Sequence, residues 1–346
     1  MTESCRLAFL GFGNVGRALA QLLEAKSEEL AGRYGIAWRL TGVSSRRLGW
    51  CADPRGYDVA ALLAGERPAH SGAPVSGVAG WLRAAGADVL FEMTSLNAET
   101  GQPAIDHLRA ALEGGAHAIT ANKGPVVHGL GELTALARAR GRRFLFESAV
   151  MDGAPIFSLW RECLPAAEVR SLRGILNSTT NLILSLMGEG KSYEEAVAYA
   201  QSIGIAETDP SADVLGWDAA VKVAALVTVL MGVPLKPGEI ERRGIDGLAA
   251  ADVSAARAQG RRWKLICRAE RAGDGIRASV APEVLGPDDP LYSVEGTSSA
   301  VTFESDVLPS LTIVEGDPGP ETTAYGLLAD LIAAVGVHGD RPRPRR

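Results

Sequence analysis

Two ionisable side chains occupy an otherwise apolar stretch of the sequence. Asp218 and Lys222 stand four residues apart, which places them on one face of a helix. An exposed pair at this spacing contributes only about 0.2–0.5 kcal/mol. The neighbouring positions are apolar, namely Val221, Val223, Ala225, Leu226 and Val229. Because buried charges are costly unless they pair or perform chemistry, the pattern favours a catalytic pair that lines a cleft.

Other polar groups accompany this pair. Glu207 and Asp213 come shortly before it, and carboxylates such as Glu207 and Asp218 can bind a substrate ammonium group. Lys123 follows a predicted strand, and open α/β sheets bind ligands along the carboxyl ends of their strands. Residues 174–181 end another predicted strand with several small polar side chains. The alternative role for that segment is a helix cap by Asn177 or Ser178.

A glycine-rich loop lies between a predicted strand at 7–10 and a predicted helix at 15–30. It reads Gly11, Phe12, Gly13, Asn14, Val15, Gly16. In a dinucleotide-binding fingerprint the first glycine makes the turn, the second admits the pyrophosphate, and the third packs helix on strand. The phosphates then bind N–H groups at the helix N-terminus. We expect dinucleotide binding here, with an ordinary glycine turn as the alternative.

The end of the second predicted strand indicates which dinucleotide is preferred. An acid there binds the ribose 2′-hydroxyl of NAD, whereas an arginine accommodates the 2′-phosphate of NADP. The segment contains Ser44, Arg46 and Arg47 and no acid. It therefore predicts a preference for NADP. The alternative is that both arginines face solvent and that NAD serves equally well.

Carbonyl reduction by a nicotinamide needs a proton as well as a hydride. A lysine can supply the proton if burial or a neighbouring cation lowers its pKa from ~10.4 toward the working pH. Lys123 and Lys222 are the two candidate donors.

The helices and strands that must position these residues follow two different patterns along the chain. Before residue 150, short apolar segments alternate with helical ones, which is typical of a parallel sheet covered on both faces. We predict a Rossmann-type doubly wound α/β domain, with strands at 7–10, 38–43, 88–92, 116–120 and 144–147 and helices at 15–30, 102–112 and 130–140. Residues 44–86 are expected to be loops around one or two short helices.

Beyond residue 150, helices and strands mix without strict alternation, which predicts a second, α+β domain. The expected helices are 179–188, 192–203, 212–231 and 321–335, and the expected strands are 169–176, 262–269, 276–282, 301–304 and 312–314.

Composition agrees with a two-domain enzyme. The 346 residues exceed the ~250–300 residues at which a single core stops growing. The net charge of −6 argues against nucleic acid as the main partner, and no apolar run is long enough for a convincing membrane span. The four cysteines lie far apart, which fits a reducing cytosol, so we expect a cytoplasmic protein. The basic tail at 341–346 is expected to be disordered.

Six stretches, in order, resemble homoserine dehydrogenases. They are residues 10–16, 120–125, 146–157, 174–184, 204–222 and 314–331, so the resemblance extends from about residue 7 to about 335. It implies NAD(P)-dependent interconversion of L-aspartate 4-semialdehyde and L-homoserine, a step toward threonine, methionine and isoleucine. It also implies a homodimer, and we expect no appended regulatory domain.

The resemblance assigns roles to individual residues by position. Lys222 and Lys123 match the two lysines to which the family assigns proton transfer and contact with the substrate or the cofactor. Substrate binding is assigned to Glu207, Asp213, Asp218 and the backbone of Gly204. Cofactor contacts are assigned to Thr94, Ser95 and Gly319, so the last helix should rejoin the first domain.

A monovalent cation site, usually sodium, is also implied by the resemblance. It would use Glu147 with the backbone carbonyls of Val150, Asp152 and Ala154. One carboxylate plus carbonyl oxygens suits a hard cation. Two residues depart from the family pattern, which usually has glycine in place of Ser178 and commonly glycine or a small apolar residue in place of Asp152.

We accordingly assign residues 1–147 with 312–340 to dinucleotide binding and residues 148–311 to substrate binding and dimerisation. Two other functions stay open. One is a related oxidoreductase acting on a different amino-acid semialdehyde or keto acid. The other is a non-catalytic nucleotide-sensing protein, against which the joint presence of Lys123, Glu207, Asp218 and Lys222 counts.

Overall fold

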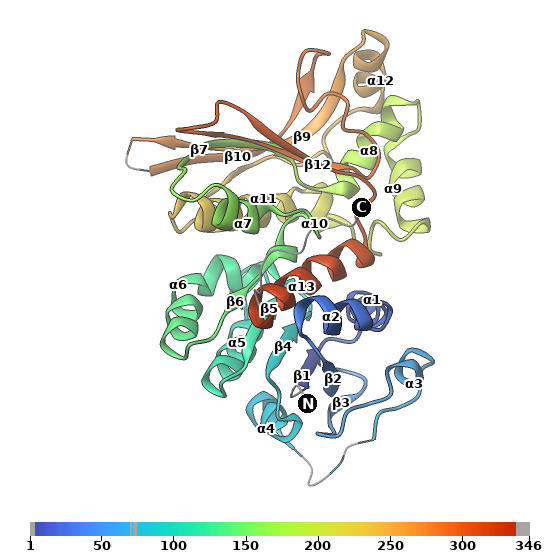
Figure 1. Cartoon of the computed structure of the whole chain (residues 1–346). Coiled ribbons are helices and arrows are strands. Elements are labelled where there is room, and N and C mark those ends of the chain that lie inside the picture. Colours follow the sequence, from blue (N-terminus) through green and yellow to red (C-terminus); the bar gives the residue numbers. More distant parts are fainter. Residues whose placement is uncertain (1–3, 70, 72–74, 274, 337–346) are drawn as a thin grey trace. The chain divides into compact units, whose positions relative to one another are not determined.

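The computed structural model describes residues 4–69, 71, 75–273 and 275–336 (Figure 1). The basic tail at 341–346 lies outside these residues. The chain divides into two compact units. Unit 1 extends to Pro155 and resumes at Gly319, and unit 2 is Ile156–Pro318.

Unit 1 is built on a six-stranded sheet in the order β3-β2-β1-β4-β5-β6. Five strands run parallel, namely β1 (Cys5–Leu10), β2 (Trp38–Ser45), β4 (Val89–Glu92), β5 (His117–Thr120) and β6 (Phe144–Leu145). The edge strand β3 (Gly49–Ala52) pairs antiparallel with β2. The predicted doubly wound α/β class is confirmed.

Helices cover both faces of this sheet. Adjacent residues of a strand point to opposite faces. Leu7 and Phe9 of β1 accordingly join the core under α1 (Asn14–Ala25) and α13 (Pro320–Val335), which lie side by side in Figure 1. Ala8 and Leu10 join the core on the other face. The remaining helices of unit 1 are α2 (Ser27–Tyr34), α3 (Val59–Leu63), α4 (Gly77–Ala85), α5 (Ala104–Glu113) and α6 (Lys123–Ala139).

Unit 2 contains a second six-stranded sheet, in the order β12-β11-β7-β9-β10-β8. Its strands are β7 (Val169–Ile175), β8 (Glu241–Arg242), β9 (Arg262–Ala272), β10 (Gly275–Leu285), β11 (Ser299–Ser305) and β12 (Leu311–Glu315). Neighbours pair antiparallel except β10 and β8, which run parallel. This is the α+β arrangement expected beyond residue 150.

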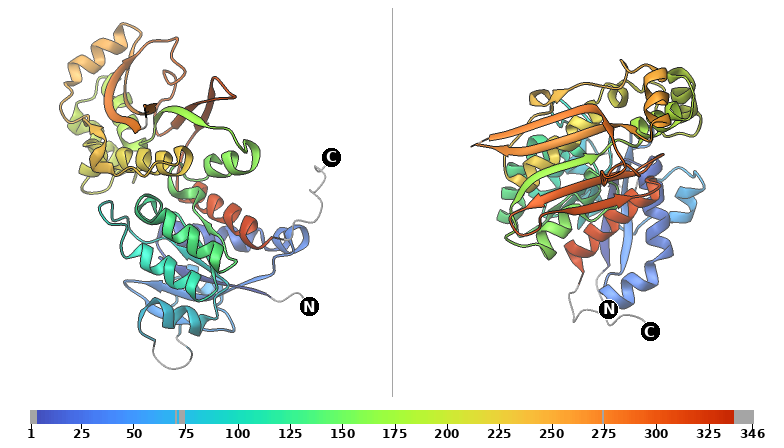
Figure 2. Two further views of the ribbon diagram at one scale, coloured as in Figure 1. Left: turned by 90° about the vertical axis from the view of Figure 1, so that its left-hand side faces the viewer. Right: turned by 90° about the horizontal axis from the view of Figure 1, so that it is seen from above.

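Helices α8 (Ser178–Gly188) and α11 (Trp217–Leu226) pack against β9, and α12 (Ala250–Ala258) packs on α8. In the left view of Figure 2, α11 is the yellow helix below the strands. The other helices of unit 2 are α7 (Ile156–Ser158), α9 (Tyr193–Ser202) and α10 (Ser211–Val214).

Some predicted boundaries differ from the structure. Gly216 adopts a left-handed conformation with φ +79°, which breaks the helix predicted at 212–231 into α10 and α11. The helix predicted at 15–30 is likewise two helices. The helix predicted at 130–140 already begins at Lys123, because Asn122 caps it.

The two compact units divide the chain at slightly different residues from the predicted domain boundaries near 147 and 312. Strand β12 pairs with β11, so the segment from Leu311 to Pro318 belongs to unit 2. The segment that ends at Pro155 belongs to unit 1, where the Thr322 hydroxyl donates to the Asp152 carboxylate (3.2 Å). Within the described residues, no helix combines the length and the hydropathy that crossing a membrane requires.

Candidate active site

The three glycines of the N-terminal loop each meet a different physical requirement. Gly11 has φ +102°, and a Cβ there would collide with the carbonyl oxygen of Met93. A Cβ at Gly16 would lie 2.5 Å from the carbonyl oxygen of Gly11, so only glycine lets α1 pack this closely. A Cβ at Gly13 would meet nothing within 4 Å. Gly13 therefore borders open space at the N-cap of α1, where a pyrophosphate could approach.

A cavity of about 690 Å³ opens beside this loop in unit 1. Such a volume is within the usual range for small-molecule sites. Its lining includes most of the predicted cofactor contacts, namely Gly11, Phe12, Gly13, Ser44, Arg46, Arg47, Thr94 and Ser95. Five other predicted contacts are outside that lining, namely Asn14, Val15, Gly16, Lys123 and Gly319. Gly319 is the N-cap of α13.

The lining also includes three polar or aromatic residues that were not among the predicted contacts, namely Arg17, Trp50 and Glu66. Arg17 lies on α1 and donates to the carbonyl oxygens of Leu62 and Leu63, at 3.5 and 2.5 Å. Trp50 lies on β3 and Glu66 lies shortly after α3, in a segment for which the sequence predicted only loops around one or two short helices. Only the i+3 spacing of Arg17 from Asn14 could have indicated its position on the loop side of α1.

A buried glutamate fixes the segment that carries Thr94. Glu92, the last residue of β4, is fully buried. It accepts hydrogen bonds from the Thr94 amide (2.9 Å), from the Thr94 hydroxyl and from the Thr120 hydroxyl (2.7 Å). Burial raises the pKa of Glu92. Sequence reasoning missed this residue, although a glutamate that ends an apolar strand was a usable signal.

Lys123 is the first residue of α6 and follows β5 at the carboxyl edge of the sheet, as predicted. The cap residue before it, Asn122, accepts from the Gly124 amide (3.0 Å). The side-chain amide of Asn122 (Nδ2) also donates to the carbonyl oxygens of Thr94 (3.4 Å) and Ser95 (3.5 Å). The start of α6 is thus tied to the cavity wall.

In unit 2, Lys222 and Asp218 form the ion pair that their spacing indicates. Lys222 Nζ lies 3.3 Å from Asp218 Oδ2, and the two side chains are only 16% and 17% exposed. Lys222 Nζ also donates to the carbonyl oxygen of Leu176 (2.7 Å), the residue that follows β7. The pair is therefore held in a fixed, largely dehydrated position rather than on a solvated helix face.

Asn177 organises this group, and the sequence prediction did not include it as a site residue. Its Oδ1 accepts from the Thr180 amide (2.8 Å) and so caps α8. Its Nδ2 donates to Asp213 Oδ1 (2.6 Å) and to Asp218 Oδ2 (3.0 Å). One side chain thus both caps α8 and holds the two aspartates. We call Asn177, Asp213, Asp218 and Lys222 the polar group of unit 2.

The other predicted substrate contacts lie apart from this arrangement. Glu207 and Gly204 are exposed and belong to the loop between α9 and α10. Gln201 Nε2 holds that loop by donating to the carbonyl oxygens of Glu207 (3.2 Å) and Thr208 (3.1 Å). Ser178 shares a hydrogen bond with Ser299 (Oγ to Oγ, 3.2 Å), so its hydroxyl is accommodated at the start of α8.

The segment with the predicted cation ligands lies in unit 1. Glu147, Val150 and Ala154 are buried, and the Glu147 amide donates to Asp330 Oδ2 (2.8 Å). Asp152 has φ +38°, and its carboxylate accepts from Thr322. Among the residues that the structure describes, no three His, Cys, Asp or Glu side chains gather as a metal centre. The predicted set relies on backbone carbonyls, and its oxygen donors have the chemistry that a hard cation prefers.

Asp213 should make stability depend on pH. Burial and the neighbouring Asp218 raise the pKa of Asp213 above its usual 3.8. The folded state therefore binds this proton more tightly than the unfolded state. The cost of the buried charge is fully present above the folded pKa and disappears as pH falls to about 3.8.

We expect Asp213→Asn to raise Tm at pH 7, and we expect that gain to vanish by about pH 3.8, as measured by thermal melts across this range. Asp209→Asn is the control, and we expect it to lower Tm at pH 7. Hydrogen bonds from the Ser211 side chain and backbone amide lower the pKa of Asp209, so its charge stabilises the folded state. A lower Tm for Asp213→Asn at pH 7 would show that its charge stabilises the fold.

Comparison with known proteins gives a consistent result. A family model described as homoserine dehydrogenase matches residues 155–332, and one described as the NAD binding domain of homoserine dehydrogenase matches residues 11–147. The NAD(+)-dependent homoserine dehydrogenase of Pseudomonas canavaninivorans is 39% identical, over 96% of each chain. The homoserine dehydrogenase of Sulfurisphaera tokodaii is 33% identical, over 94% of this chain and 97% of its own.

Solved structures agree with these matches. A homoserine dehydrogenase from Thiobacillus denitrificans has a TM-score of 0.81 at 30% identity, over 95% of this chain and 73% of its own. A hyperthermophilic archaeal homoserine dehydrogenase mutant in complex with NADPH has a TM-score of 0.79 at 28% identity, over 96% and 98%.

Proposed function

The chain belongs to the homoserine dehydrogenase family, and we propose that the polar group of unit 2 binds L-homoserine and moves its hydroxyl proton. The family activity is an NAD(P)-dependent oxidation at a CH–OH group, which converts L-homoserine to L-aspartate 4-semialdehyde and back. The observation that carries the proposal is the dehydrated Lys222–Asp218 pair, held by Asn177 and by the Leu176 carbonyl.

We propose that Lys222 is the proton donor and acceptor. A bound nicotinamide would supply hydride chemistry, as acceptor from the carbon that bears the hydroxyl or as donor in the reverse direction. Lys222 Nζ takes up the hydroxyl proton during oxidation and donates it to the carbonyl oxygen during reduction. Asp218, 3.3 Å away, stabilises the ammonium form, and the Leu176 carbonyl orients it. Lys123 is the second proposed lysine, contacting substrate or cofactor from unit 1.

Substrate orientation is assigned to carboxylates. The ammonium group of homoserine carries one positive charge, and we propose that Asp213 and Glu207 bind it together with the backbone of Gly204. Asp213 is already fixed by Asn177 (2.6 Å). Glu207 is on an exposed loop and would engage the substrate from there.

We propose NADP as the preferred cofactor, with NAD as the alternative. Arg46 and Arg47 line the cavity beside the glycine loop, and an arginine there accommodates the 2′-phosphate of NADP. Glu66 lines the same cavity and favours NAD, because an acid can bind the ribose 2′-hydroxyl of that cofactor.

We expect kcat/KM to be higher with NADP than with NAD, and the double variant Arg46→Ala, Arg47→Ala to reverse that order. Initial rates with each dinucleotide at saturating homoserine, with Arg55→Ala as an exposed arginine control, measure both effects. A tenfold preference for NAD in the wild type would overturn the assignment.

The remaining features of the proposal rest on the family resemblance. We propose a sodium ion at Glu147 with the carbonyls of Val150, Asp152 and Ala154, a homodimer formed through unit 2, and a cytoplasmic role in the synthesis of threonine, methionine and isoleucine. The cysteines Cys5, Cys51, Cys163 and Cys267 are all free, which suits a reducing compartment.

An absorbance assay on the purified protein tests the function. Homoserine should drive reduction of NADP, and L-aspartate 4-semialdehyde should drive oxidation of NADPH. Activity confined to another amino alcohol would favour the related oxidoreductase. Dinucleotide binding without turnover of any amino alcohol would favour a nucleotide-sensing protein.

A further inference from the structure

Unit 2 contains a buried lysine that the proposed reaction does not use. Lys264, on β9, is only 1% exposed. Its Nζ donates to Asn181 Oδ1 (3.0 Å) and to the carbonyl oxygen of Val294. Neither acceptor is charged, and no residue in the described part of the chain forms an ion pair with this lysine. Burial of an ammonium group without a counter-ion costs several kcal/mol, so an apolar residue would be the more stable choice here.

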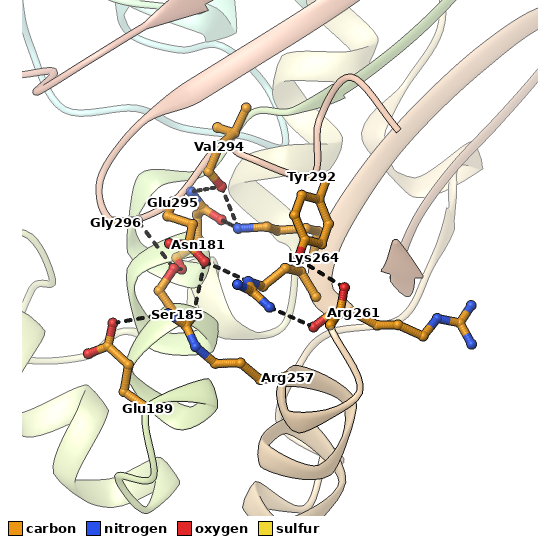
Figure 3. Close-up of polar contacts among 12 residues, drawn as sticks. Asn181, Ser185, Glu189, Arg257, Arg261, Lys264, Tyr292, Val294, Glu295 and Gly296 are labelled. Atoms are coloured by element: carbon orange, nitrogen blue, oxygen red, sulfur yellow. Dashed lines mark hydrogen bonds and ion pairs between the residues drawn. The ribbon is translucent and has the colours of Figure 1, made fainter. Parts of the chain in front are cut away.

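Both acceptors belong to one network around the segment 291–298, which precedes β11 (Figure 3). Asn181 is fully buried on α8, and its Nδ2 donates to the carbonyl oxygens of Val294 (3.2 Å) and Ser298 (3.0 Å). Lys264 thus orients the side-chain amide of Asn181, because it donates to Oδ1. Nδ2 of Asn181 then faces the segment and donates to its carbonyl oxygens. The two side chains hold segment 291–298 against α8 and β9, alongside the Gly296 amide, which donates to Ser185 Oγ of α8 (3.2 Å).

A second layer of contacts holds the same segment from its outer side. Glu295 accepts from Arg257 (3.0 Å) and from Arg262 (2.8 Å), and Tyr292 donates through its hydroxyl to the Gly260 carbonyl (2.9 Å). The outer contacts are partly exposed. Arg257 also lies 3.7 Å from Glu189, the residue that caps the C-terminus of α8, whereas the Tyr292 bond is made to the turn between α12 and β9. The Tyr292 bond provides a comparison that separates the stability of the segment from its attachment to the helix.

The inner contacts lead to the polar group of unit 2. Asn181 lies one turn beyond Asn177, the N-cap of α8, and the backbone N–H of Asn181 donates to the backbone carbonyl of Asn177 (3.2 Å). Ser299, which directly follows the segment, shares a hydrogen bond with Ser178 (3.2 Å). Segment 291–298 is therefore joined to the first turn of α8 both through Asn181 and through Ser299. That turn carries Asn177, which holds Asp213 and Asp218.

We propose that Lys264 is a positioning residue for the dehydrogenase reaction. Through Asn181 it locks segment 291–298 onto α8 and so keeps Asn177, with its two aspartates, in the geometry that Lys222 requires. This inference rests on the proposed role of the polar group of unit 2.

The positioning does not depend on the charge of the lysine. Burial lowers the pKa of Lys264 to about 8, with Glu295 raising it and Arg262 and Arg257 lowering it. A neutral amine still has two N–H donors, which is enough for Asn181 and Val294. The bonds persist on either side of the pKa, so removal of the donors, rather than a change of pH, is the informative perturbation.

The test compares kcat per dinucleotide-binding site in three variants of the full chain. Lys264→Met removes both inner bonds at similar length. Asn181→Asp keeps an acceptor for Lys264, gives it a counter-ion, and removes the two bonds to the segment. Tyr292→Phe removes one outer bond of the same segment and is the control.

We expect Lys264→Met and Asn181→Asp each to lower kcat for homoserine oxidation by about tenfold to a hundredfold, because small displacements of catalytic groups have effects of this size. The Kd for NADP should change less than twofold in both, and Tyr292→Phe should keep its wild-type kcat. In the double variant the losses should not multiply, since both residues act through one attachment.

Three outcomes would overturn the inference: wild-type kcat in Lys264→Met, an equal loss in Tyr292→Phe, or loss of NADP binding in both inner variants, which would assign Lys264 to folding alone. A wild-type protein that does not oxidise homoserine would instead contradict the proposed function.

Discussion

Replacement of Lys222 with alanine is expected to lower kcat for homoserine oxidation by about 10²–10⁴-fold, the usual contribution of a general acid–base residue. The physical reason is that Lys222 Nζ is the proton-carrying group of a dehydrated pair, fixed by Asp218 (3.3 Å) and by the Leu176 carbonyl (2.7 Å). The Kd for NADP should remain within about twofold, because the glycine loop and its cavity belong to unit 1. Steady-state kinetics and fluorescence titration with NADPH measure the two quantities.

Lys191→Ala is the matched control, because Lys191 is an exposed lysine of the same unit. It should keep the wild-type kcat. Lys222→Arg keeps the positive charge but cannot exchange a proton near neutral pH, so it should be nearly as impaired as Lys222→Ala. Retention of most activity in either Lys222 variant would remove this residue from proton transfer.

Replacement of Gly13 with alanine is expected to weaken NADP binding by at least about tenfold, or ~1.4 kcal/mol, without loss of stability. The Gly13 backbone is extended, with φ −89° and ψ −153°, and so lies outside the left-handed region that favours glycine. A Cβ there would meet nothing within 4 Å of the protein. The methyl group would instead occupy the space that the pyrophosphate needs at the N-terminus of α1.

Gly16→Ala is the informative contrast to Gly13→Ala. Its Cβ would lie 2.5 Å from the Gly11 carbonyl oxygen, so α1 would have to move away from the loop. We expect a lower Tm for Gly16→Ala and an unchanged Tm for Gly13→Ala, measured without cofactor. If Gly13→Ala binds NADP as tightly as the wild type does, the pyrophosphate does not approach the protein at this loop.

The strongly periodic parts of the fold were predictable from the sequence. Alternating strands and helices identified the parallel sheet of unit 1, because apolar segments buried on both faces leave a clear pattern. Strand β3 was not predictable, since Gly49–Ala52 is short and gains its hydrogen bonds only by pairing with β2. The break at Gly216 was also missed, because a left-handed glycine inside an apolar stretch is ambiguous from sequence alone.

The site was predictable only where chemistry and spacing coincide. The i,i+4 spacing of Asp218 and Lys222 led to a contact that the structure contains. The role of Asn177 could not be deduced, because its two aspartate partners are 36 and 41 residues away and are joined to it by tertiary structure. Lys264 was missed for the same reason: a lysine within a strand pattern normally faces solvent, and only packing shows that this one is buried.

A crystal structure of the protein with NADP and homoserine would show which group meets the reacting oxygen. We expect the homoserine hydroxyl to lie within hydrogen-bond distance, about 2.6–3.2 Å, of Lys222 Nζ. We also expect the homoserine ammonium group to contact Asp213 or Glu207. A homoserine molecule bound with its hydroxyl away from Lys222, and with another acid or base at the reacting oxygen, would exclude Lys222 as the proton donor and acceptor.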